Sequence, residues 1–183
     1  GGQGPLLARK ILGRLALAAG LHVKVSEVHG MSQRGGSVIT HVRVGDAVHA
    51  PLVGLAGADY LLSFEALEAA RAAAYLKADG VAIVNAQRIL PMPVITGAAT
   101  YPADPLKDAV LAGHRVEAVD ALALAVSAGS QKAVNLVLLV MLSQHLPLAD
   151  EQWRQAIASS VPRATMAVNI KAFEAGRASV TLN

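Results

Sequence analysis

Residues 58–87 decide the fold of this chain and read ADYLLSFEALEAARAAAYLKADGVAIVNAQ. Segments 59–64 and 80–85 are short apolar runs of the length that strands have. Between them, residues 65–76 are rich in alanine, the strongest helix former, and predict a helix. A strand, a helix and a second strand in this order form a βαβ unit, in which the two strands run parallel. The segment therefore predicts an α/β fold.

The sequence on either side of residues 58–87 also predicts strands and helices in alternation. Apolar residues at helical spacing predict helices over 5–19, 133–145 and 165–176. Alternating apolar and polar residues predict strands over 21–28 and 37–44, and the second is a candidate for antiparallel pairing with the first. Prolines and a glycine around residues 94–95 predict a loop or a short strand there.

Several short polar side chains stand where helices would begin. Asp104, which precedes a proline, predicts one helix start, and Asp120 and Ser130 are candidate caps for two more. Asp150 predicts the start of a further helix. With no repeat, charge block or linker to divide residues 1–183, we expect a single three-layer α/β/α domain with a mostly parallel sheet.

Composition narrows the classes of function. Hydrophobic residues make up 54% of the chain and charged residues 16%, which allows a packed core and leaves an apolar surplus for a partner surface. A net charge of +3 from scattered residues, with 3% aromatic residues, argues against nucleic-acid binding. The longest apolar run, 133–142, is shorter than the roughly 20 residues of a membrane span. We expect a cytoplasmic protein that binds neither nucleic acid nor membrane.

The turn Gly1-Gly2-Gln3-Gly4 precedes the first predicted helix and is one candidate site. Backbone N–H groups at a helix start can bind phosphate. The spacing matches neither G-x-G-x-x-G nor a Walker motif, so a tight structural turn is the favoured interpretation and a phosphate-binding turn the alternative. Because a glycine-rich turn usually follows a strand, we also expect a strand upstream of residue 1.

The segment 29–36 is the second candidate site and the most unusual stretch of the chain. It lies between the two strands predicted to pair, and its glycines permit close approach of a ligand to the backbone. An arginine in such a loop offers a rigid fork for carboxylate or phosphate. We therefore expect it to face a ligand or a partner, rather than to form a plain surface turn. Its candidate residues are His29, Gly30, Ser32, Gln33, Arg34, Gly35 and Gly36.

Catalytic and metal signatures are missing from the chain. The absence of cysteine excludes disulfides, Cys-ligated zinc and iron–sulfur clusters from these 183 residues. His29, His41 and His49 fit no known metal spacing, so we interpret them as exposed or hydrogen-bonded histidines. No nucleophile elbow and no thiamine diphosphate motif occur. We expect no catalytic residue and no metal site.

The chain resembles the gamma-type domain of 2-oxoacid:ferredoxin oxidoreductases, in particular the domain of the indolepyruvate type. The resemblance is carried by Gly1–Gly4 and by residues 26–38, SEVHGMSQRGGSV. Pyruvate enzymes of this family usually carry Y-G-x-E-x-R-G-G where this chain has H-G-M-S-Q-R-G-G. Further agreement covers residues 58–65, 80–85, 101–102, 129–135, 169 and 172–176, so the resemblance extends over nearly the whole chain.

The resemblance implies a subunit that is inactive alone. The complex would oxidatively decarboxylate an aryl 2-oxoacid with coenzyme A and reduce ferredoxin. Thiamine diphosphate, Mg²⁺ and the iron–sulfur clusters would lie on a large partner subunit, with no cofactor on this chain. His29, Gln33 and Arg34 would then face the partner or the CoA phosphates. The alternatives are an independent nucleotide- or anion-binding module, a stand-alone enzyme and a purely structural scaffold subunit.

Overall fold

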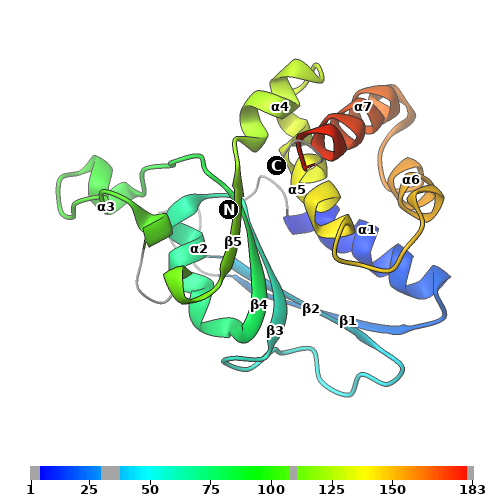
Figure 1. The fold of residues 1–183 in the computed structure, drawn as a ribbon, viewed down its shortest axis with the longest axis horizontal. Coiled ribbons are helices and arrows are strands. Elements are labelled where there is room, and N and C mark those ends of the chain that lie inside the picture. Colours follow the sequence, from blue (N-terminus) through cyan, green and yellow to red (C-terminus); the bar gives the residue numbers. More distant parts are fainter. Residues whose placement is uncertain (1–4, 30–37, 108–110, 181–183) are drawn as a thin grey trace.

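The computed structural model describes residues 5–29, 38–107 and 111–180. Its strands form one antiparallel hairpin and one parallel sheet of order β3-β4-β5 (Figure 1). The hairpin consists of β1 (His22–His29) and β2 (Val38–Gly45), and the sheet of β3 (Ala58–Ser63), β4 (Leu76–Asn85) and β5 (Arg115–Val119). The expected parallel sheet and the expected antiparallel pairing of the first two strands are both confirmed.

Helices cover both faces of the parallel sheet, which confirms the predicted three layers (Figure 1). One face carries α2, and the other carries α5, against which α1, α4 and α7 pack, with α6 packed on α1 and α7. The helices are α1 (Pro5–Ala18), α2 (Ala66–Ala72), α3 (Met92–Ile95), α4 (Ala121–Ser127), α5 (Val134–Ser143), α6 (Asp150–Ala158) and α7 (Arg163–Val180).

The central strand β4 separates two apolar clusters. Val81 and Ile83 belong to the larger cluster on the α5 side, whereas Ala82 and Val84 belong to the smaller cluster beneath α2. Successive side chains of a strand point to opposite faces, so a strand covered on both faces is continuously apolar. This arrangement explains the unbroken run VAIV in the sequence.

Helix α5 is the centre of the larger cluster. All of its residues are buried, as expected for a helix that is apolar on every side. Trp153 of α6 and Phe173 of α7 stack beside it with ring centroids 6.5 Å apart. Within 5–29, 38–107 and 111–180, none of the helices combines the length and apolar character needed to cross a bilayer.

The βαβ unit differs from its prediction at the helix end. We predicted a helix over 65–76, but α2 ends at Ala72, a short 3₁₀ turn follows, and β4 already begins at Leu76. Gly80 permits this longer strand: a Cβ there would lie 3.1 Å from the carbonyl oxygen of Ala58 and 3.0 Å from that of Lys77. Alanine propensity alone could not reveal that Leu76 pairs with Ala58.

The structure differs from the sequence predictions at residues 94–95 and after Asp104, and agrees with them at two helix caps. Residues 94–95, predicted as a loop or short strand, lie in the short helix α3, and β5 was not predicted. The described part of the helix predicted after Asp104 is only the 3₁₀ turn Pro105–Lys107. The caps are confirmed, because Asp120 accepts from the Ala123 N–H at 2.9 Å and Ser130 accepts from the Lys132 N–H at 3.2 Å.

A hollow of about 1020 Å³ lies between β2 and β3. Residues 38–44 and 57–64 line it without a gap. Because alternate residues face opposite sides of a strand, consecutive lining residues indicate that both strands present their edges to the hollow. Within the described residues, β2 pairs only with β1 and β3 only with β4, so the facing edges lack strand partners.

We propose that an extended strand, joined ahead of residue 1 as the sequence predicts, lies in this hollow and connects β2 to β3. Unpaired backbone groups that are shielded from water are costly, and a strand between the two edges would satisfy both.

This proposal predicts a gain in stability from an added strand. Extending the chain ahead of Gly1 by about six apolar β-branched residues should raise its melting temperature and slow amide exchange in β2 and β3. A control with prolines in the added segment should show neither effect, because proline cannot donate to a strand ladder. Equal melting temperatures for the two extended chains would contradict the proposal.

Candidate functional site

The carboxyl ends of the parallel strands meet at one edge, where open α/β sheets commonly bind ligands. Asn85 ends β4 there and is completely buried. Its Nδ2 donates to the carbonyl oxygen of Phe64 at 3.2 Å, and its Oδ1 accepts from the N–H of Ala121 at 3.1 Å. One amide therefore links the end of β3, the end of β4 and the start of α4.

Glu65 follows β3 at the same edge, and its carboxylate has partners on both oxygens. Oε2 caps α2 by accepting from the Glu68 N–H at 2.9 Å. Oε1 accepts from the Ile89 N–H at 3.3 Å and from the hydroxyl of Tyr101. A buried carboxylate held in this way positions its neighbours and is not available as a general base.

Residues 89–103, here named the arm, project from this edge at the left of Figure 1. Both legs of the arm bond to Glu65 Oε1, one through Ile89 and the other through Tyr101. Arg88 closes the base by donating to the Ala103 carbonyl oxygen at 2.6 Å, and its guanidinium lies 5.8 Å from the centre of the Tyr101 ring. The base of the arm is thus rigidly fixed to the sheet.

The tip of the arm is held by its own hydrogen bonds. Thr96 donates from its hydroxyl to the Met92 carbonyl oxygen at 3.0 Å and so reinforces α3. Gly97 follows with φ of +75°, a left-handed conformation that glycine adopts without strain. The Ala99 N–H then bonds back to Pro93 at 2.9 Å. The arm is a structured element rather than an open loop.

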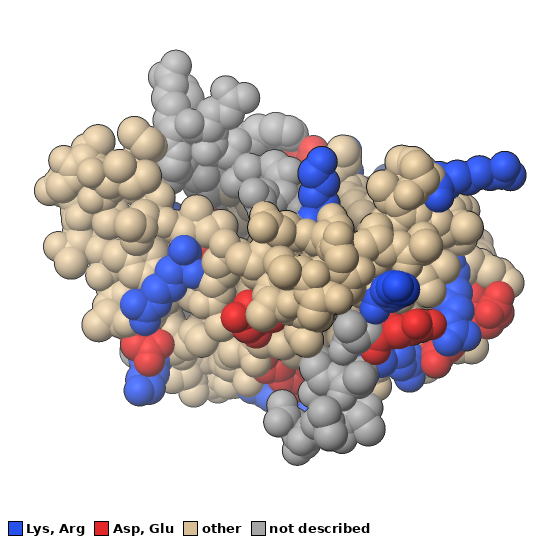
Figure 2. Space-filling model, turned by 90° about the horizontal axis from the view of Figure 1, so that it is seen from above, with Lys and Arg blue, Asp and Glu red and all other residues tan. Residues whose placement is uncertain are grey.

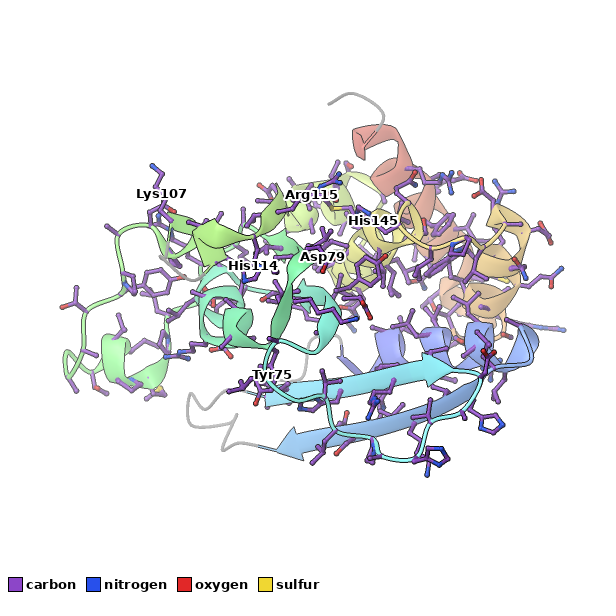
Figure 3. All side chains as sticks on the ribbon, turned by 60° about the horizontal axis from the view of Figure 1, so that its bottom comes forward. Tyr75, Asp79, Lys107, His114, Arg115 and His145 are labelled. Atoms are coloured by element: carbon purple, nitrogen blue, oxygen red, sulfur yellow. The ribbon has the colours of Figure 1, made fainter. Side chains whose placement is uncertain are left out.

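A second polar cluster lies where α5 approaches the sheet, around His145 (Figure 3). The Nε2 of His145 lies 3.0 Å from Glu117, whose other oxygen pairs with Arg115 at 2.7 Å. Tyr60 of β3 donates to the His145 carbonyl oxygen at 3.1 Å. These contacts fasten the end of α5 to β3 and β5, which is a structural role.

The predicted site residues lie largely outside the described part of the chain. This holds for Gly1–Gly4 and for residues 30–36. The structure does show that α1 begins at Pro5 and that the hairpin ends with the pair His29–Val38, so both segments have fixed neighbours. Neither site is tested by these contacts.

Two of the three histidines singled out in the sequence, His41 and His49, have side chains that the structure describes, and their surroundings differ. His41 is buried, accepts from the Val53 N–H at 3.3 Å and packs edge-on against Tyr75, which lies over the hairpin (Figure 3). His49 is exposed. For these two residues the prediction of hydrogen-bonded or exposed histidines is confirmed. In the described ranges no group of His, Cys, Asp and Glu could hold a metal ion.

Sequence reasoning missed the residues that organise the sheet edge. Asn85 carried a signal, because a polar residue ends an otherwise apolar strand. Glu65 was placed within the predicted helix, because glutamate is not among the residues that usually cap a helix start. No local signal joins Tyr101 to Glu65, since 36 positions separate them.

We predict that Tyr101 ionises at a higher pH than an ordinary tyrosine. Burial, reinforced by the hydrogen bond and the charge of Glu65, raises the pKa of Tyr101 above its usual value near 10. A raised folded-state pKa stabilises the fold below about pH 10, and this contribution is lost as the pH rises through the folded-state pKa. The phenolate absorbance that the native protein gains in a step above about pH 10 should therefore be missing that step in Tyr101→Phe. A variant that retains this step would disprove the assignment.

The chain is similar in sequence to known proteins over almost its whole length. The family model described as pyruvate ferredoxin/flavodoxin oxidoreductase matches residues 1–179. The chain is 48% identical over 181 residues to the indolepyruvate oxidoreductase subunit IorB of Thermococcus kodakarensis, covering 96% of this chain and 90% of that protein. The corresponding subunit of Pyrococcus horikoshii is 45% identical with the same coverage.

Solved structures show the same fold at lower identity. The gamma subunit of a keto/oxoacid ferredoxin oxidoreductase from Geobacter sulfurreducens matches with a TM-score of 0.72 at 23% identity, over 100% of this chain and 95% of that one. A 2-oxoglutarate:ferredoxin oxidoreductase from Magnetococcus marinus matches with a TM-score of 0.72 at 15% identity, over 100% of this chain and 30% of that one. By its sequence and its fold, the chain belongs to the pyruvate ferredoxin/flavodoxin oxidoreductase family.

Proposed function

We propose that this chain is the cofactor-free subunit of an indolepyruvate-type 2-oxoacid:ferredoxin oxidoreductase. In the complex, an aryl 2-oxoacid loses carbon dioxide, its acyl group passes to the sulfur of coenzyme A, and the released electrons reduce ferredoxin. The observation that carries the proposal is the 48% identity to an indolepyruvate oxidoreductase subunit over nearly the full chain.

The chemistry of the residues supports a division of labour within the complex. Iron–sulfur clusters are bound by cysteine thiolates, and the chain has no cysteine, so these clusters do not fit it. It also lacks the thiamine diphosphate motif, and Glu65, the buried carboxylate at the sheet edge, is fully engaged in hydrogen bonds. We therefore assign thiamine diphosphate, Mg²⁺ and the clusters to a large partner subunit.

We assign the two candidate loops, Gly1–Gly4 and residues 29–36, to contact with a ligand or the partner. Arg34 and Gln33 offer charged and amide donors, and His29 ends the strand that leads into the loop. A guanidinium binds a phosphate or carboxylate through paired hydrogen bonds, which suits CoA or a 2-oxoacid. The turn Gly1–Gly4 would add backbone N–H donors near the start of α1.

The first test is reconstitution. Co-expressed with its thiamine-binding partner, the chain should co-purify and support dye reduction that depends on both an arylpyruvate and CoA. The partner alone should be inactive. Full activity of the partner alone, or failure of the two chains to associate, would refute the proposed function and favour an independent nucleotide-binding module. In that case CoA or nucleotide should raise the melting temperature of the isolated chain.

Substitution of Arg34 separates a ligand-facing loop from a purely structural subunit. In the assembled complex, Arg34→Ala should raise the KM for CoA or the 2-oxoacid about tenfold or more, because a charge-assisted hydrogen bond contributes roughly 1.5–3 kcal/mol. Arg34→Lys should recover part of the loss.

The matched control is Arg154→Ala, which removes an exposed arginine on α6 and should leave both KM values unchanged. Normal kinetics for Arg34→Ala would favour the scaffold role and remove Arg34 from the ligand site.

A further inference from the structure

Helix α1 runs back along strand β1, which brings the start of the helix near the end of the strand (Figure 1). Residues 19–21 alone connect the two, and the Leu21 N–H donates to the Ala16 carbonyl oxygen at 2.9 Å where the chain turns back. The 14 residues of α1 span about 21 Å and the 8 residues of β1 about 26 Å. In the sequence, Gly1–Gly4 precede the start of α1 and residues 30–36 follow the end of β1.

An ion pair joins α1 to β1 near this shared end. Arg9, in the second turn of α1, lies 2.9 Å from the carboxylate of Glu27, which is two residues before the end of β1. The two side chains are 32% and 19% exposed, so salt screens the pair less than it screens fully exposed charges. Apolar packing of a helix on a strand is non-directional, whereas a guanidinium–carboxylate pair restricts how α1 slides or turns on β1.

The charges of the described residues form no broad basic patch on the face seen in Figure 2. Lys and Arg side chains lie there singly or beside Asp and Glu. A field that attracts a phosphate or a carboxylate from a distance needs one sign of charge gathered over a surface. An anionic ligand would gain little from the general field of this face and would depend on a few donors held at the right separation.

We propose that Arg9 and Glu27 are positioning residues for the reaction of the complex. Their ion pair sets the separation between the start of α1 and the end of β1, and thereby between the donors of Gly1–Gly4 and of Arg34. This inference rests on the proposed function, because it assigns those donors to one phosphate or carboxylate, of CoA or of the 2-oxoacid. Partly exposed ion pairs add little to stability, so the effect of this pair belongs in substrate binding.

The test removes the charge of Arg9 and nearly keeps its length. In the assembled complex, Arg9→Gln should raise the KM for CoA or for the 2-oxoacid about fivefold and change kcat less than about twofold, because a misplaced binding group weakens uniform binding. The substrate whose KM rises identifies the source of the anion. Arg9→Lys, which retains the charge, should recover part of the loss.

A double-mutant cycle tests whether the two residues act together. Glu27→Gln should raise the same KM, and Arg9→Gln/Glu27→Gln should raise it by less than the product of the two single effects. The matched control is Lys77→Ala, which breaks the ion pair with Asp59 at the amino ends of β3 and β4 and should leave both KM values unchanged. Circular dichroism melts should show that all variants fold.

The outcomes separate this inference from the proposed function. If the unaltered chain forms an active complex and Arg9→Gln leaves both KM values unchanged, the positioning role is wrong and the proposed function stands. A fall in kcat or in melting temperature without a rise in KM would overturn the positioning role as well. If the unaltered chain forms no active complex with its partner, the proposed function fails, and this inference fails with it.

Discussion

The buried amide of Asn85 is the constraint on which the rest of the sheet edge depends. It sits at the end of the central strand, where one side chain must satisfy groups from β3 and α4 at once. An aspartate there could not donate, and an apolar residue could neither donate nor accept, so either would leave buried backbone groups unpaired. Because α4 leads into α5, the same amide also orients the helix at the centre of the larger core.

Small side chains make the two-sided core possible. Ala69 and Ala73 let α2 approach one face of β4 closely, while α5 packs on the other with larger residues. The high alanine content therefore reflects layer spacing as well as helix propensity.

Local patterns in the sequence predicted the layers but not the contacts between distant segments. The apolar strands, the alanine-rich helix and the caps Asp120 and Ser130 all follow from propensities that act over a few residues. The short strand β5 carries Arg115 and Glu117, so no apolar run marked it. The link between Glu65 and Tyr101 exists only in the folded chain, and the segments chosen as candidate sites await the substitutions that test them.

The sharing of one carboxylate by a helix cap and an arm has a mechanical consequence. Oε1 of Glu65 bonds to both legs of the arm, and Oε2 caps α2. Separating either leg of the arm from the sheet would therefore break a hydrogen bond to the same carboxylate that caps the first turn of α2. The base of the arm and the start of α2 are thus coupled through a single side chain, so a substitution of Glu65 would loosen both.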